Sequence, residues 1–261
     1  MASSTPNSPQ LVREQHSSTV EQTPFDPQVE EEVEEEEPLV QRLADKYPGA
    51  QVTGIDLSPI QPTFVPPNLK FIVDDAEDAW ISSEKFDLVH MRMMAFSIFD
   101  WPQLFGRAYA QLHPGGYIEL QDVVGLACDD GTFTSNPPSC RFAEWWALVT
   151  DAFEKLGQDI DATSQHKEKL EAAGFVNVTV IDFKWPVSMW PEDETMKTIG
   201  MWSMANTLDA LEALAMAPLT RALAWTPESV RMLLQDARAD IENESIHAYW
   251  IIRVVYSQKP E

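Results

Sequence analysis

Positively charged residues are scarce in this sequence. The chain has 18 lysines and arginines against 42 aspartates and glutamates, which gives a formal net charge of -24. Binding to nucleic acid or to an anionic membrane relies on clustered basic side chains that release counterions. The composition therefore argues against both kinds of partner.

Cysteine and long apolar runs are scarce as well. Cys128 and Cys140 are the two cysteines, and they lack the further thiols or histidines of a disulfide framework or a metal site. No run approaches the roughly 18 apolar residues of a membrane span, and Met1 to Gln10 does not have the pattern of a signal peptide. We expect a cytoplasmic protein without a metal; the sequence indicates no oligomeric state.

Two regions follow from the composition along the chain. Residues 1–37 are rich in Ser, Thr, Pro, Gln and Glu, and they have too little apolar surface to offset chain entropy. They are predicted to form a disordered acidic tail. Residues 38–261 have regular apolar patterns and are predicted to form one domain.

Strand and helix patterns alternate through the first half of that domain. The periodicity predicts a helix from Leu39 and another over 101–112, which ends at His113-Pro-Gly-Gly116. Strands are expected at 51–57, 69–73, 86–91 and 117–122. This alternation favours an α/β fold, with a parallel sheet covered by helices on both faces.

The second half is predicted to be mainly helical. Strands are expected at 175–185 and 246–257, and helices at about 140–156, 165–173, 192–217 and 227–241. We interpret the helical stretches at about 140–173 and 192–241 as insertions that form a lid. Tryptophans and methionines gather in this half, where they could hold a flat hydrophobic molecule, although core packing is the alternative explanation.

Polar residues stand at the ends of three successive predicted strands. Asp56 ends the first strand, Asp74-Asp-Ala-Glu-Asp78 follows the second, and His90-Met-Arg92 ends the third. In doubly wound sheets such strand ends open onto the ligand crevice, where a carboxylate can bind the ribose hydroxyls of a nucleotide cofactor. The alternatives are that Asp56 caps a turn and that the acidic loop is a solvated edge.

These motifs together resemble the fungal LaeA-like class I S-adenosylmethionine-dependent methyltransferases. The resemblance covers roughly Leu39 to the C-terminus, and its main stretches are Val52-Thr-Gly-Ile-Asp-Leu-Ser-Pro-Ile-Gln-Pro62, Phe71-Ile-Val-Asp-Asp-Ala-Glu-Asp-Ala-Trp80, Phe86-Asp-Leu-Val-His-Met-Arg92, His113-Pro-Gly-Gly-Tyr-Ile-Glu-Leu-Gln-Asp122 and His247-Ala-Tyr-Trp250. It implies a Rossmann-like sheet with an antiparallel C-terminal strand, S-adenosylmethionine as cofactor, and a role in secondary-metabolite biosynthesis. Some relatives act in the nucleus, which is therefore the alternative location.

The resemblance also implies a set of cofactor-binding residues at the three strand ends. They are Asp56 at the ribose, Asp75 and Ala76 at the adenine, and His90 and Met91 on the floor of the cleft, with Leu57 and Asp74 as further cofactor-binding residues. His90 and His247 are the candidate general bases. The alternative for each histidine is a structural role.

The sequence departs from the family before Leu39. Family members have a central first strand and a glycine-rich turn there, whereas this chain has Val33-Glu-Glu-Glu-Glu-Pro38. Glutamate side chains fill space that the backbone amides need, and their charge repels the cofactor carboxylate. We expect weakened cofactor binding, and either direct pairing of the strands at 51–57 and 86–91 or a gap between them.

Three hypotheses of function follow. The chain either transfers a methyl group to a small hydrophobic acceptor, or serves without catalysis as an accessory or regulatory partner of a pathway enzyme. The third hypothesis is that a different first exon supplies the first strand in the natural protein.

Overall fold

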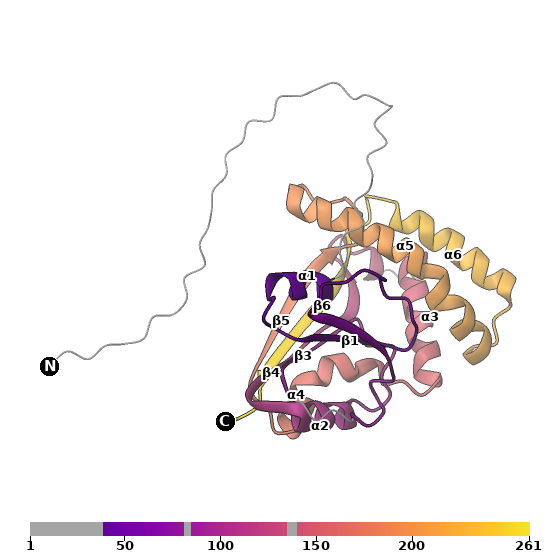
Figure 1. Cartoon of the computed structure of the whole chain (residues 1–261). Coiled ribbons are helices and arrows are strands. Elements are labelled where there is room, and N and C mark those ends of the chain that lie inside the picture. Colours follow the sequence, from indigo (N-terminus) through magenta and orange to yellow (C-terminus); the bar gives the residue numbers. More distant parts are fainter. Residues whose placement is uncertain (1–38, 81–84, 135–139) are drawn as a thin grey trace, which may run out of the picture. The chain divides into compact units, whose positions relative to one another are not determined.

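The computed structural model describes residues 39–80, 85–134 and 140–261 (Figure 1). The predicted acidic tail over 1–37 and the glutamate run that ends at Pro38 lie outside these residues. The chain divides into two compact units: described residues 39–52 with Thr63–Lys70, and Thr53–Pro62 with Phe71–Glu261.

The first unit contains helix α1 (Leu39–Lys46), which begins at the predicted residue. Asn68 holds the chain after this helix. Its side-chain amide donates to the carbonyl oxygens of Ala44, Tyr47 and Ala50 at 3.0, 3.2 and 3.0 Å. Carbonyl groups at the end of a helix have no partner within the helix, so this side chain supplies the missing donors.

Strands β1 (Val52–Asp56) and β2 (Leu69–Val73) form a two-stranded sheet. The amide of Val52 donates to Asn68 O at the start of the pair, and the amide of Asp74 donates to Asp56 O at its end. The two strands therefore run in the same direction, and their carboxyl ends lie together.

A four-stranded sheet has the order β3-β4-β6-β5. Its strands are β3 (Phe86–Arg92), β4 (Leu112–Cys128), β5 (Val176–Pro186) and β6 (Ala248–Gln258). Strands β3 and β4 are parallel and are connected through α2 (Trp101–Gln111), whereas β6 is antiparallel to both of its neighbours. The predicted crossover and antiparallel last strand are confirmed. The described strands form two sheets, so direct pairing of β1 with β3 does not occur.

Strand β4 is longer than the predicted segment at 117–122. Phe86 pairs with Leu112 and Leu88 with Tyr117, so residues 113–116 bulge out opposite Asp87. Gly115 has φ +79° in this bulge, a left-handed conformation that favours glycine. The segment His113-Pro-Gly-Gly116, which was predicted to end the preceding helix, thus lies inside the strand. Past Gln121, which pairs with the last residue of β3, β4 continues beside β6 alone.

Helices pack on both faces of this sheet. Successive side chains on a strand point to opposite faces. On β6, Val255 belongs to one buried cluster with α2 and α4 (His166–Ala172). Trp250 and Ile252 belong to the other cluster, with α3 (Arg141–Lys155), α5 (Glu194–Ala222) and α6 (Pro227–Ile241). These three helices lie side by side (Figure 1). The lid function predicted for the helical stretches stays a prediction.

Two short 3-10 helices complete the described elements, at Thr132–Thr134 and Ile160–Gln165. No helix within the described ranges is both long enough and apolar enough to cross a membrane.

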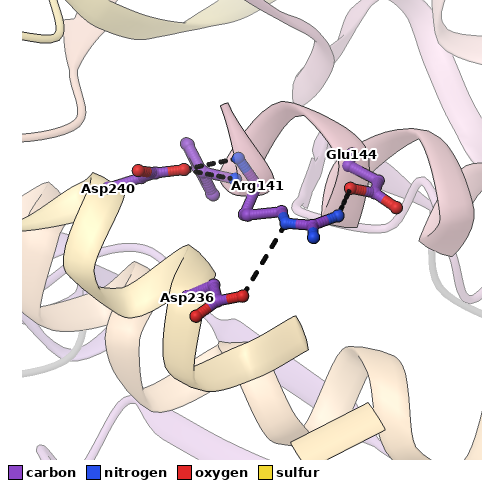
Figure 2. Close-up of polar contacts among 5 residues, drawn as sticks. Arg141, Glu144, Asp236 and Asp240 are labelled. Atoms are coloured by element: carbon purple, nitrogen blue, oxygen red, sulfur yellow. Dashed lines mark hydrogen bonds and ion pairs between the residues drawn. The ribbon is translucent and has the colours of Figure 1, made fainter. Parts of the chain in front are cut away.

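The start of α3 is capped by a residue of another helix. Cys140 precedes α3 without a side-chain cap, and the carboxylate of Asp240 on α6 accepts hydrogen bonds from the amides of Arg141 and Phe142 (Figure 2). The Arg141 side chain extends the contact to Glu144 and, at 3.7 Å, to Asp236. A negative charge at a helix N-terminus is favourable, so Asp240 joins α3 to α6.

The Asp240→Ala variant is expected to lose about 1–2 kcal/mol of the free energy of unfolding, because two helix-start amides lose their acceptor. Urea unfolding followed by circular dichroism measures this loss. Asp236→Ala is the matched control on the same helix; its exposed ion pair with Arg141 should contribute much less, because solvent screens it. Equal losses in the two variants would contradict the capping role.

Candidate cofactor site

The carboxyl ends of β1 and β2 place the first acidic residues next to each other. The amide of Asp74 donates to Asp56 O at 3.0 Å. Asp56 Oδ1 accepts the amide of Ser58 at 2.9 Å, which is the turn-capping contact that the sequence offered as the alternative. Leu57 is 69% exposed beside it. A carboxylate and an apolar side chain thus stand together at this edge.

The loop after β2 is held by its own carboxylates. Asp74 Oδ1 accepts the amide of Asp75 at 2.9 Å, and Asp75 Oδ1 accepts the amide of Glu77 at 2.8 Å. The indole of Trp80 donates to Ala76 O at 2.9 Å. These bonds fix the backbone around the residues that the resemblance assigns to adenine.

Glu77 connects this loop to the segment before α2. Its carboxylate oxygens accept the amide of Phe99 at 3.1 Å and the amide of Asp100 at 2.8 Å. The end of β2 and the region after β3 are therefore neighbours, as the strand-end argument requires.

His90 lies on β3 beside Glu119 of β4. Its Nδ1 is 3.2 Å from Glu119 Oε1, and the two side chains are 28% and 35% exposed. Met91, the next residue, is half-buried and packs against the cluster that contains α2. The structure thus gives His90 a carboxylate partner and an accessible ring.

The turn after β3 is bound by a buried carboxylate. Asp122 accepts the amides of Met94 and Ala95 at 3.0 and 3.1 Å. Burial raises the pKa of Asp122 to about 6, while these two hydrogen bonds act in the opposite direction. Met93, which donates to Gln121 O, has φ +54°. The turn is therefore fixed by β4 in a conformation that is uncommon outside glycine.

His247, the second candidate base, lies just before β6. Its ring stacks on Trp190 with a centroid distance of 4.7 Å and an interplanar angle of 12°. Its amide donates to Asp130 Oδ2 at 2.6 Å. These contacts hold His247 in place, and its role as a base stays a prediction.

Aromatic side chains connect the turn after β3 to α3. The Phe96 ring lies 5.8 Å from Trp146 and 4.7 Å from Phe153. Trp145 is 1% exposed, whereas Trp202 on α5 is 51% exposed. Trp145 thus belongs to the core, and Trp202 lies at the surface.

Sequence reasoning did not assign roles to Glu77, Glu119 and Asp122. Each lies in a stretch that the resemblance included, but each acts on backbone or side chains from another strand or loop. The weak signal was a carboxylate at Asp122 in the alternating positions that Ile118 and Leu120 fill with apolar side chains, since a buried carboxylate needs hydrogen-bond donors.

Comparison with known proteins identifies the class of this chain. Residues 37–180 match the family described as "Methyltransferase domain". The chain belongs to this methyltransferase family, and its α/β architecture is that of the class I, Rossmann-like methyltransferases.

Relatives with higher sequence identity include two fungal proteins. Methyltransferase pytC of Aspergillus terreus is 38% identical over 220 residues, which cover 84% of this chain and 67% of that protein. The secondary metabolism regulator LAE1 of Cochliobolus heterostrophus is 36% identical, with 84% and 72% covered. A solved protein of Anabaena variabilis, assigned as a methyltransferase from an antibiotic biosynthesis pathway, has a TM-score of 0.51 at 14% identity, covering 83% and 85%. The chain is a LaeA-like member of the family.

Proposed function

We propose that this protein binds S-adenosylmethionine at the carboxyl ends of β1, β2 and β3 and methylates a small hydrophobic acceptor of fungal secondary metabolism. The observation that carries the proposal is the hydrogen bond from Asp74 N to Asp56 O, which puts the two acidic strand ends side by side. Family membership and the LaeA-like and pytC relatives support the same function.

The described residues fit the adenosine part of this cofactor. Asp56 supplies carboxylate oxygens for ribose hydroxyls, and Asp75 with the Ala76 backbone supplies groups that complement adenine. The exposed Leu57 offers an apolar surface beside them. The glutamates that replace the glycine-rich turn lie outside the described residues, so the proposal rests on the adenosine half.

When bound, the cofactor supplies an electrophilic methyl group. The protein contributes position, because most of the barrier to such a transfer is lowered by holding the reacting atoms in line. We assign His90 to accept the proton of the acceptor at Nε2, since Glu119 binds Nδ1 and orients the ring.

The Asp56→Ala variant is expected to bind S-adenosylmethionine at least about 10-fold more weakly than the wild type, because hydrogen bonds to a carboxylate contribute about 1.5–3 kcal/mol. Isothermal titration calorimetry measures the affinity. Asp78→Ala removes the same charge from an exposed position nearby and should change the affinity less than about twofold. A folded wild-type protein without measurable affinity would contradict the proposal.

The second candidate is an accessory or regulatory protein without catalysis, which the relationship to a protein named as a regulator favours. Incubation with methyl-labelled cofactor and a panel of small hydrophobic hydroxy compounds distinguishes the two. Labelled product that is lost in Asp56→Ala supports the enzyme, and cofactor binding without any product supports the accessory role.

A further inference from the structure

The segment from Met93 to Asp100, called the β3–α2 loop below, is held at both ends by carboxylates from other elements. Asp122 of β4 binds the amides near its start, and Glu77 of the loop after β2 binds the amides at its end. Four backbone amides of one loop therefore donate to two carboxylates, and the sequence alone did not assign a role to either carboxylate.

Glu77 is not simply the cap of α2. Asp100 already caps that helix, because its side chain accepts the amide of Gln103 at 2.9 Å. Glu77 binds the two residues that come before the helix, Phe99 and Asp100. Its carboxylate thus ties one loop to another, and α2 would have its cap without it.

The backbone of Glu77 is tied equally closely to the proposed adenine residues. Its amide donates to Asp75 Oδ1 at 2.8 Å, and Ala76 is the residue between them. A continuous path therefore runs from the Asp75 carboxylate, through the backbone and side chain of Glu77, to the β3–α2 loop. Movement of Glu77 would displace Asp75 and Ala76 together.

The β3–α2 loop is a firm support for this contact. Phe96 in its middle packs against Phe153 of α3, and Phe96 O accepts the side-chain amide of Gln158 at 2.7 Å. Ile98 is 2% exposed. Phe99 itself is 60% exposed, so Glu77 binds the exposed end of a loop whose middle, at Phe96 and Ile98, is packed.

We propose that Glu77 is a positioning residue of the adenosine site: its carboxylate anchors the loop after β2 to the β3–α2 loop and so fixes Asp75 and Ala76 in the geometry that receives adenine. The inference rests on the proposed function, because it concerns the same site. Glu77 itself does not contact the ligand in this role; it acts through its neighbours.

The test compares the affinity of the full chain for S-adenosylhomocysteine with its thermal stability. Glu77→Gln retains the shape of the side chain but replaces one of its two acceptor oxygens with a donor. We expect about 10-fold weaker binding by calorimetry. Glu77→Asp, which keeps the charge but is one methylene shorter, should also weaken binding, because it cannot reach both amides.

Two controls separate positioning from charge and from stability. Asp78→Asn alters an exposed neighbour in the same loop and should leave the affinity within twofold of the wild type. Asp240→Ala destabilises the protein at the α3–α6 contact and should also leave the affinity unchanged. A loss of affinity in Asp240→Ala that equals the loss in Glu77→Gln would overturn the positioning role.

Hydrogen exchange of the ligand-free protein gives a second readout. The amides of Phe99 and Asp100 should exchange faster in Glu77→Gln, whereas the amides bound by Asp122 should be unaffected. Glu77→Gln that binds within twofold of the wild type overturns this inference alone. A folded wild type that does not bind S-adenosylhomocysteine overturns the proposed function and this inference with it.

Discussion

The difference in the free energy of unfolding between the His166→Phe variant and the wild type is expected to shift by about 3 kcal/mol in favour of the variant as the pH falls from 7 to 4. His166 is 1% exposed, and its ring packs 4.4 Å from Trp101 and 5.5 Å from Phe105. Within the described part of the chain, neither ring nitrogen has a hydrogen-bond partner. Burial, followed by the charges of Lys169 and Arg253, lowers the pKa of His166 to about 3, while Asp159 opposes the shift.

The sign follows from proton binding. Below the ordinary histidine pKa of 6.5, the unfolded chain takes up a proton that the folded protein refuses until the pH approaches 3. Stability from the neutral ring is thus complete above pH 6.5 and is lost as the pH falls. A phenylalanine at position 166 keeps a ring against Trp101 but cannot be protonated, so the His166→Phe variant does not lose this stability.

The measurement must compare the two proteins at each pH. Asp122, whose pKa is raised to about 6, acts in the opposite direction: the folded protein binds its proton first and gains stability as the pH falls from 6 to 4. This gain masks much of the His166 effect in the wild type alone. Urea unfolding of both proteins between pH 7 and pH 4 isolates it, and His113→Gln, at an exposed histidine, should parallel the wild type. A constant difference between His166→Phe and wild type would refute the expectation.

Gly200→Ala is expected to lower the free energy of unfolding by about 2 kcal/mol, although alanine is the better helix former by about 1 kcal/mol. Gly200 lies inside α5 where this helix crosses the backbone at Ser188. A methyl group there would overlap the Ser188 carbonyl oxygen and lie 2.8 Å from its carbon. Both obstacles are backbone atoms, so the helix must move away from the chain beneath it.

Gly106→Ala is the matched control. Gly106 lies in α2, is exposed, and has no heavy atom within 4 Å of the position of an added methyl group. The same substitution should therefore stabilise the protein by about 0.5–1 kcal/mol. Thermal unfolding of both variants should show shifts in opposite directions, and two shifts of the same sign would refute the close approach at Gly200.

The helix that the sequence predicted best has local signals at its start. Helix α6 runs over the predicted residues, because Thr226 caps it and Pro227 suits its first turn. Helix α5 continues to Ala222, past the predicted end at 217, even though Pro218 lies inside it. Buried Pro218 and Leu219 hold that last turn through tertiary packing, which a local pattern does not record.

The candidate site was predictable to the level of strand ends and no further. A strand pattern shows where Asp56 and Asp74 fall, and a rule for parallel strands brings them together. The contacts of Glu77 with Phe99 and of Asp122 with Ala95 join residues 22 and 27 positions apart. These contacts depend on how the loops pack against each other, and hydrophobic periodicity does not predict loop packing.

The length of β4 and β6 has a consequence for protein engineering. These two strands run from the cluster shared with α2 and α4 into the cluster shared with α3, α5 and α6. Helices α3, α5 and α6 are therefore not a separate module joined by a linker. A chimera that exchanges these helices with those of a relative must also carry the second half of β4 and the first half of β6, because the boundary between the two buried clusters lies within these strands.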